Sequence, residues 1–435
     1  MSVPEIRPFR ALRYQPDIVG DPASVVAPPY DVIEPDRQRI LMARHPKNAV
    51  RLDLPPVEAG DEPGDRYRRA ARMLAAWRSD GTLRKDPRPS LYVYEQTYRV
   101  PGSDEERIQR GFFGILRLEP LGEGVLPHER TMSGPKEDRY RLLRATGINT
   151  SPVVALYEDP SGEAAAALAA ATVTPSAVDL ADDEGVRHRL WVLADTGDGP
   201  VGILRARAGA RPVVIADGHH RYETALRYRD ERRMSRSCEE DPAFDYALVL
   251  FLEATGSPLT VLPTHRLIRG LPDDGRRLID ELEPLVTVRP SSADELVRTF
   301  GAPSGGGAGR FGVWTRDGGA TLNASRAAFG PLLASAGPAT RDLDVSLLGA
   351  ALERVAGIDA AAVAAGERVA YTKSAEDAIA AVDERRDGID AAFLLEPTPV
   401  ASILAVARAG ELMPQKSTYF YPKALTGLVF NPHEW

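Results

Sequence analysis

The most informative segment of the chain is Arg211-Pro212-Val213-Val214-Ile215-Ala216-Asp217-Gly218-His219-His220-Arg221-Tyr222. Its mostly apolar residues before Asp217 predict a short buried strand, and Asp217-Gly218 predicts a tight turn. From Tyr222 to about Arg232 the sequence predicts a helix. A helix start offers free backbone N–H groups and the positive end of a dipole, so this strand, loop and helix suit an anion such as phosphate.

The alternative is that Asp217-Gly218 is only a turn and that the histidines are solvated. Two adjacent histidines and Arg221 at one helix start favour a binding site instead. We do not expect His219 and His220 to hold a metal, because adjacent side chains diverge and no third ligand follows at a familiar spacing.

The composition is that of a soluble globular protein. At 435 residues the chain is expected to form two or three domains. Its formal charge of −8 argues against a nucleic-acid partner, because such proteins present a basic face. With one cysteine, no disulfide framework is expected. The sequence has no signal peptide and no apolar run near about 18 residues, so we expect a cytoplasmic protein that avoids membranes.

Three further motifs carry polar groups at the ends of predicted elements. In Pro-Pro-Tyr-Asp-Val-Ile (28–33) the prolines either form a structural turn or aim Tyr30 and Asp31 in a fixed direction. The segment 124–139 contains His128 and Glu129, which suit acid–base chemistry unless the loop is merely solvated. His265 and Arg266 end a strand predicted over 259–267.

The segment 411–423 ends in Lys-Ser-Thr-Tyr-Phe-Tyr-Pro-Lys. It is not a phosphate-binding P-loop, because Gln415 replaces the glycine required before the lysine. Lysine and hydroxyl side chains nevertheless suit phosphate oxygens. Only six of the 54 basic residues are lysines, so a lysine within a dense motif is more informative here than in most chains.

The composition and the order of the predicted helices and strands divide the chain into three regions. Residues 1–269 carry the motifs and form a core domain, with helices expected over 35–44 and 65–78. Strands are expected over 48–54, 90–100 and 108–118. Residues 270–410 alternate alanine-rich helices with short strands, which indicates a smaller α/β domain or insertion. Residues 411–435 are expected to return to the core as a strand segment.

The segments 28–33, 126–131, 216–225 and 416–423 resemble the bacterial domain-of-unknown-function family numbered 1015, DUF1015. The segment 217–221 also resembles, more remotely, the phosphate-binding loop of the ParB/sulfiredoxin superfamily. That superfamily includes kinases that phosphorylate free L-serine with ADP or ATP. The resemblance implies an α/β (α+β) fold, in which a mixed-sheet core carries a strand-loop-helix nucleotide site.

By this resemblance the chain is a phosphotransferase that uses ATP or ADP with Mg²⁺ and acts on the hydroxyl of serine or a similar metabolite. Glu129 would be the base, with His128, Asp217 and His220 in supporting catalytic roles. Phosphate would be bound by these residues: Gly218, His219, Arg221, Lys416, Ser417 and Thr418. The acceptor would be bound by these: Tyr30, Asp31, His265 and Arg266.

Two other functions remain open from the sequence. One is a ParB-like switch that binds and hydrolyses nucleotide, and the other is a non-catalytic protein that binds an anionic metabolite. The acidic balance of the chain argues against a chromosomal role for the first. A small molecule is the expected partner in each case, and the sequence also permits a homo-oligomer.

Overall fold

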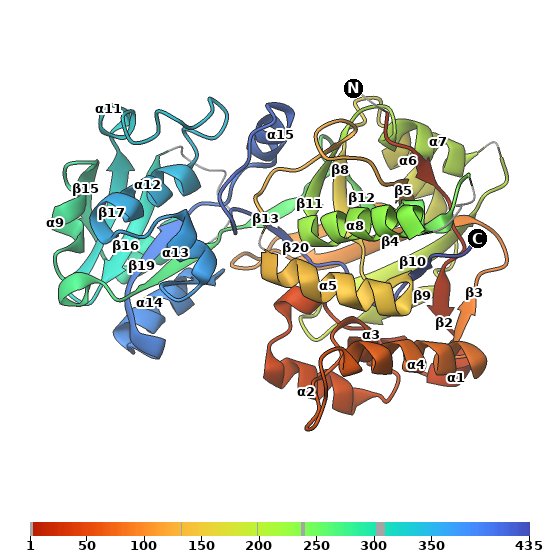
Figure 1. Cartoon of the computed structure of the whole chain (residues 1–435). Helices are drawn as coiled ribbons and strands as arrows, with labels where there is room; N and C mark the ends of the chain where they lie inside the picture. Colours follow the sequence, from red (N-terminus) through yellow and green to blue (C-terminus); the bar gives the residue numbers. More distant parts are fainter. Residues whose placement is uncertain (1–2, 132, 198, 236–239, 302–308) are drawn as a thin grey trace.

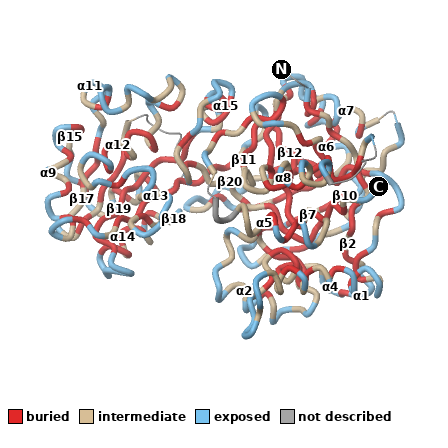
Figure 2. Tube along the Cα trace, in the orientation of Figure 1, coloured by how far each residue is buried: buried red, intermediate tan, exposed pale blue. Residues whose placement is uncertain are grey.

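The computed structural model describes residues 3–131, 133–197, 199–235, 240–301 and 309–435. The chain forms a large lobe and a smaller lobe that lie side by side (Figure 1). Buried residues follow the sheets of both lobes (Figure 2). The α/β class predicted from the sequence is confirmed. None of the helices in the described part of the chain has the length and apolar character of a membrane span.

A large mixed sheet forms the centre of the large lobe. Two of its strand pairs are parallel and the others are antiparallel, and β1 (Ile6–Arg7) pairs with one of its central strands, β5. The other strands lie in this order: β6 (Val125–Leu126), β11 (Val213–Asp217), β8 (Val153–Tyr157), β12 (Tyr246–Glu253), β5 (Glu106–Arg117), β4 (Ser90–Arg99), β10 (Arg187–Ala194) and β9 (Val178–Ala181). The strands predicted over 90–100 and 108–118 are β4 and β5, which pair as antiparallel neighbours.

Strand β11 is buried on both faces, which is why its sequence is a continuous apolar run. Val213 and Ile215 pack against helices on one face, and Val214 and Ala216 belong to the core on the other. The first face is covered by these helices: α5 (Ser133–Thr146), α6 (Glu163–Ala171), α7 (Pro200–Ala208) and α8 (His219–Ser235). The second face is covered by α15 (Val400–Arg408) and the C-terminal segment.

The N-terminal elements pack beside the large sheet. The helices predicted over 35–44 and 65–78 are confirmed as α2 (Pro35–Arg44) and α4 (Asp65–Ser79). The remaining elements of this region are α1 (Pro16–Val19), η1 (Pro22–Ser24), η2 (Tyr30–Val32), β2 (Leu12–Tyr14) and β3 (Leu83–Lys85).

The strand predicted over 48–54 is wrong, because this segment contains the short helix α3 (Val50–Asp53). The buried Asn48 side chain sets this conformation. Its Oδ1 accepts from the N–H of Val50 at 3.0 Å, and its Nδ2 donates to the carbonyls of Ser24 and Val26 at 2.8 and 2.9 Å. Apolar residues spaced over one helical turn resemble a short strand, so the sequence pattern did not separate the two.

The smaller lobe contains a second sheet. Its strands lie in this order: β15 (Val286–Ser291), β17 (Gly318–Ala324), β16 (Arg310–Thr315), β19 (Ile389–Leu395), β14 (His265–Arg269) and β18 (Val369–Thr372). Its helices are η4 (Pro272–Gly275), α9 (Leu278–Leu282), α10 (Ala293–Phe300), α11 (Arg326–Phe329), α12 (Asp344–Ala356), α13 (Ala360–Ala365), α14 (Ala375–Asp383) and η5 (Arg386–Gly388).

The second sheet begins before residue 270, where we expected the new domain to start. The strand predicted over 259–267 is divided by Pro263 into β13 (Thr260–Leu262) and β14, and only β14 joins the second sheet. At the other end, α15 packs with the core of the large lobe although it lies within 270–410.

The C-terminal segment lies against the large lobe. β20 (Tyr419–Tyr421) pairs with β13, and β21 (Asn431–Pro432) pairs with β7 (Ile148–Asn149). Between these pairs the segment also bridges to Ala27 and Leu12 through Thr426 and Phe430. Residues from both ends of the chain therefore help to build one surface of the large lobe.

We expect Asn48→Ala to lower the free energy of unfolding by about 2–3 kcal/mol, because a buried amide with several hydrogen bonds is lost and its backbone partners stay buried. Urea unfolding followed by circular dichroism measures this. The matched control is Asn323→Ala at an exposed position of β17, which should change stability by less than about 0.5 kcal/mol. Equal effects of the two substitutions would contradict the structural role of Asn48.

Candidate functional site

A cavity of about 470 Å³ lies where the two lobes meet. Its lining includes residues of the segments 28–34, 129–131, 216–221 and 415–423, which are the motifs of the sequence analysis. Thr264 and the segment 371–373 of the smaller lobe complete it. Segments far apart in the sequence thus converge on one space.

The start of α8 forms one wall of the cavity. The helix begins at His219 rather than at the predicted Tyr222, so His219, His220 and Arg221 lie in its first turn. Gly218 precedes it with φ of 86°, in the left-handed region that favours glycine. The N–H of Gly218 donates to Oδ1 of Asp217 at 2.8 Å. The backbone N–H groups of the first helical turn have no partner within the helix, so they can receive an anion.

Asp217 holds two cations at this helix start. Lys423 Nζ donates to its Oδ2 at 3.1 Å, and a terminal guanidinium nitrogen of Arg221 lies 3.4 Å from the same oxygen. Burial would raise the pKa of Asp217, but Lys423 and Arg221 lower it below its ordinary value. Arg221 also donates to the carbonyl of Pro152, while its buried Nε has no hydrogen-bond partner among the described residues. Asp217 therefore remains charged and positions basic groups.

His128 is fully buried and connects three segments. Its Nδ1 lies 2.5 Å from the carbonyl oxygen of Ile215, which can only accept, so Nδ1 carries the hydrogen. Burial lowers the pKa of His128 to about 4, so the ring is neutral and Nε2 accepts from the Thr418 hydroxyl at 3.1 Å. The His128 backbone N–H in turn donates to His219 Nε2 at 3.4 Å. His128 does not line the cavity, so its position fits support of the site rather than contact with a ligand.

Glu129 does line the cavity and is a strong acid–base candidate. Its carboxylate oxygens accept from the backbone N–H groups of Lys416 and Ser417 at 3.1 and 3.4 Å. Burial raises the pKa of Glu129 to about 7, although these N–H groups and the charge of Lys416 oppose the shift. A carboxyl group with a pKa near 7 can both take and return a proton at neutral pH.

The segment Lys416-Ser417-Thr418 acts differently from the anion clamp that its sequence suggested. Lys416 lines the cavity and is exposed. The Ser417 hydroxyl is buried and donates to the carbonyl of Pro414 at 2.6 Å, so it turns away from the cavity. Thr418 lines the cavity, but its hydroxyl is used by His128. The segment chiefly positions Glu129 and His128, and Lys416 alone offers an uncommitted charge to a ligand.

The expected contribution of His265 and Arg266 to acceptor binding is corrected, because neither residue lines the cavity. His265 is fully buried, and its Nδ1 accepts from the N–H of Leu395 at 3.1 Å. Arg266 is also buried and donates to the carbonyl of Thr264 at 3.1 Å. The residue before them, Thr264, reaches the cavity instead. Successive side chains on a strand point to opposite faces, so His265 is turned away from the side on which Thr264 lies.

Tyr30, Asp31 and His220 all line the cavity, as expected. The guanidinium of Arg139 lies 4.0 Å from the centre of the Tyr30 ring, and burial raises the pKa of Tyr30 to about 12. The tyrosine is therefore neutral at ordinary pH. Burial lowers the pKa of His220, against the opposing charge of Glu223.

Lys373, Tyr419 and Lys423 are cavity residues that the sequence analysis did not single out. The ammonium groups of Lys373 and Lys423 lie 3.9 and 4.3 Å from the centre of the Tyr419 ring. The scarcity of lysine was the usable signal. Among the described residues, Lys373, Lys416 and Lys423 line this cavity, which is half of the six lysines in the chain.

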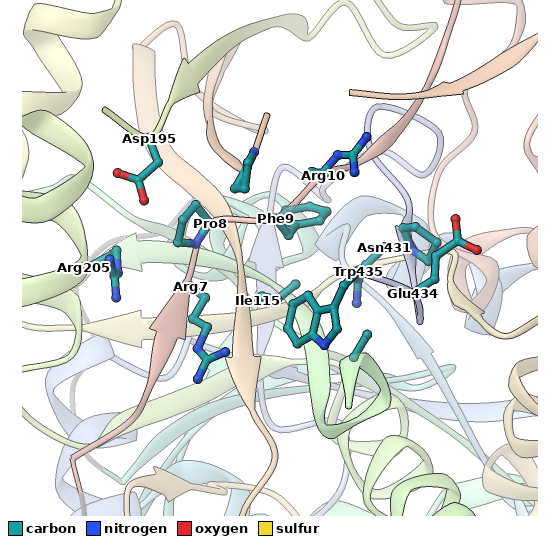
Figure 3. Close-up of a pocket in the computed structure, with 13 residues that line it drawn as sticks. Arg7, Pro8, Phe9, Arg10, Ile115, Asp195, Arg205, Asn431, Glu434 and Trp435 are labelled. Atoms are coloured by element: carbon teal, nitrogen blue, oxygen red, sulfur yellow. The ribbon is translucent and has the colours of Figure 1, made fainter. Parts of the chain in front are cut away.

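A second cavity of about 370 Å³ lies near both chain ends (Figure 3). Phe9, Pro8 and Trp435 give it an apolar floor, and Arg10 and Arg205 stand at its sides. It contains none of the residues expected at the site. We therefore take the first cavity as the candidate functional site.

The first cavity combines a helix start, several cations and one carboxyl group poised for proton transfer. This combination suits a negatively charged ligand and the removal of a proton near it. Among the described residues, no three His, Cys, Asp or Glu side chains are arranged as a metal-binding group.

We expect Gly218→Ala to cost about 1–2 kcal/mol of folding stability because of its positive φ, and also to displace Arg221. An added Cβ would lie 2.9 Å from Arg221 Nε. The matched control is Gly162→Ala, where φ is 73° and nothing lies within 4 Å of the added Cβ. Thermal unfolding should show a lower melting temperature in both variants. The affinity for anions, measured by calorimetry, should fall only in Gly218→Ala. Normal anion binding in Gly218→Ala would contradict a role for this loop.

The chain is similar to a free serine kinase in complex with AMP, with 12% identity, a TM-score of 0.35, and 74% of this chain and 90% of that chain covered. It is also similar to a conserved hypothetical protein from Pyrococcus furiosus, with 12% identity and a TM-score of 0.33. That match covers 68% of this chain and 87% of the other chain. The chain is also similar to SbnI from Staphylococcus aureus with a C-terminal truncation. The identity is 10%, the TM-score is 0.36, and the match covers 70% of this chain and 83% of that chain.

At these TM-scores the likeness carries no argument about the site. The comparison with curated proteins gives no match. One family model does match, over residues 6–346, which is most of the chain, and it confirms the family indicated by the sequence motifs. The chain belongs to the DUF1015 family, described as a protein of unknown function.

Proposed function

We propose that the protein is a nucleotide-dependent kinase that transfers a phosphoryl group to the hydroxyl of a small metabolite. One observation carries this proposal. The start of α8 with its basic side chains and the carboxyl group of Glu129, with a pKa of about 7, line the same cavity. Phosphoryl transfer needs charge positioning around the phosphates and a base for the attacking hydroxyl, and these are the two components present.

The phosphates would bind at the first turn of α8. Its backbone N–H groups, the positive end of the helix dipole and the Arg221 guanidinium are all suited to phosphate oxygens. Arg221 Nε is a buried donor that has no hydrogen-bond partner within the described ranges, so a ligand oxygen would satisfy it. Asp217 would keep Lys423 and Arg221 in place.

Glu129 would act as the general base. Its carboxylate would take the proton of the acceptor hydroxyl as the hydroxyl oxygen bonds to the terminal phosphorus, and the bond from that phosphorus to the nucleotide oxygen would break. The N–H groups of Lys416 and Ser417 fix the direction of this carboxylate. His128 is a positioning residue in this proposal, because both of its ring nitrogens are engaged within the protein.

A Mg²⁺ ion that accompanies the nucleotide would neutralise phosphate charge and needs only one or two protein carboxylates. Asp31 and Glu34, which line the cavity, fit that role. Asp217 fits it less well, because Lys423 and Arg221 already contact its Oδ2. Serine is the first acceptor to test, since the segment 217–221 resembles the loop of free-serine kinases.

The test is an assay with ATP or ADP and Mg²⁺ over free L-serine and related hydroxy acids, with phosphorylated product detected by mass spectrometry. We expect a phosphorylated hydroxyl compound to form. Nucleotide binding without product from any acceptor would overturn the kinase. Hydrolysis without an acceptor would instead indicate a nucleotide switch, and ligand binding without turnover a binding protein.

We expect Glu129→Gln to lower kcat by about 10²–10⁴-fold while nucleotide affinity stays within about twofold, since removal of a general base affects the chemical step. In the wild type, kcat/KM should rise with pH through about 7, because a base acts in its deprotonated form and burial raises the pKa of Glu129 in the ligand-free protein to about 7. The rise should vanish in Glu129→Gln and persist in the exposed control Glu283→Gln. An unchanged pH profile in Glu129→Gln would exclude Glu129 as the base.

A further inference from the structure

The smaller lobe contributes one wall of the cavity, and the transfer described above gives that wall no role. β14 and β18 are antiparallel neighbours in which His265 stands opposite Thr372. Thr264 and Lys373 come directly beyond this pair, at the same end of both strands, and both line the cavity. The second sheet thus places a hydroxyl and an ammonium group together at its edge.

The Thr264 hydroxyl lacks a hydrogen-bond partner. The residue is 9% exposed, and its Oγ1 meets no donor or acceptor among the described residues. Buried hydroxyls in proteins are nearly always paired, because an unpaired one costs about 1–3 kcal/mol. Since Thr264 lines the cavity, a bound ligand is the natural partner for this group.

Two of the three lysines that line the cavity, Lys373 and Lys416, differ from the other lysines of the chain, whereas Lys423 pairs with Asp217. Away from the cavity each lysine pairs with a carboxylate: Lys47 with Asp80, Lys85 with Glu434, and Lys136 with Glu223. In the described part of the chain, Lys373 and Lys416 have no carboxylate within ion-pair distance.

The Lys373 ammonium packs over the Tyr419 ring, and desolvation together with the charges of Lys423 and Lys416 lowers its pKa. Several like charges around one space are unfavourable while that space holds no anion. A negatively charged group between them would remove this repulsion and gain charge-assisted hydrogen bonds.

We propose that Thr264 and Lys373, with Lys416 beside them, form an oxyanion subsite on the smaller-lobe side of the cavity, separate from the start of α8. The group bound there is the terminal phosphate of the nucleotide or the carboxylate of the acceptor. The inference rests on the proposed function for the identity of these ligands. A ligand that reaches both subsites contacts both lobes, so the smaller lobe helps to select the substrate.

The experiment measures binding to the full chain by isothermal titration calorimetry, with ADP, inorganic pyrophosphate and L-serine as separate probes. Lys373→Ala should weaken binding of the anion at this subsite by about tenfold or more, which is the loss of one charge-assisted hydrogen bond. Thr264→Val removes only the hydroxyl and should weaken the same ligand by about threefold. The matched control is Lys47→Ala, which removes a lysine paired with Asp80 away from the cavity and should leave each affinity unchanged.

Loss of affinity for ADP and pyrophosphate assigns the subsite to phosphate, and loss for L-serine alone assigns it to the carboxylate. Wild-type affinities for every probe in both Lys373→Ala and Thr264→Val would overturn the subsite, as would failure of the wild type to bind any probe. Circular dichroism melting confirms that each variant is folded.

The same measurements separate this inference from the kinase proposal. Lys373-dependent binding without phosphorylated product would overturn the kinase and leave the subsite. Product formation with KM values in Lys373→Ala equal to those of the wild type would overturn the subsite and leave the kinase.

Discussion

The buried imidazole of His128 is the contact on which the cavity depends. It joins the segment before Glu129 to the carbonyl of Ile215 in β11 and to the hydroxyl of Thr418 near the C-terminus. Its arrangement requires a neutral ring, because Nε2 must accept a hydrogen bond, and burial keeps the pKa at about 4. The N–H of Met413 also donates to the carbonyl of His128 at 2.8 Å. This hydrogen bond joins the His128 segment to the C-terminal segment a second time. The contact with Ile215 attaches the segment that carries Glu129 to β11, which leads directly into α8.

Some of the basic side chains of the cavity pair with a carboxylate and others do not. Asp217 offsets Lys423 and Arg221, so the helix start carries positive charge without strong repulsion. The Tyr419 ring lies under two ammonium groups and stabilises them through its negative face. Two buried polar groups of the cavity, Arg221 Nε and the Thr264 hydroxyl, have no hydrogen-bond partner among the described residues, and they come from different lobes. Polar groups of this kind are costly in a folded protein unless a ligand uses them.

The local parts of this structure were predictable from the sequence, and the contacts between distant segments were not. Strand β11 and the loop at Gly218 followed from an apolar run and an Asp-Gly turn. The helices α2 and α4 followed from their periodicity. The scarcity of lysine marked residues that the structure brings to the cavity.

The errors have a common cause, which is that side-chain direction depends on partners elsewhere in the chain. His265 was preferred to Thr264 because the sequence carries no information on which face of β14 meets the cavity, and a step of one residue reverses the face. The position of Lys373 depends on the pairing of β14 with β18, about 100 residues apart in the chain. The helix α3 was mistaken for a strand because the hydrogen bonds of Asn48 reach back to Ser24 and Val26.

The spread of the cavity residues along the chain, from Tyr30 to Lys423, bears on how the protein matures during synthesis. The strands of the large sheet all lie before residue 254, and protein domains generally begin to fold as they leave the ribosome. The sheet and the helix start can therefore form early. Glu129 gains its N–H partners, and Asp217 gains Lys423, only when the last segment docks. In an unfinished chain, Glu129 and Asp217 consequently lack these partners, and the candidate site is complete only after the C-terminal segment has docked.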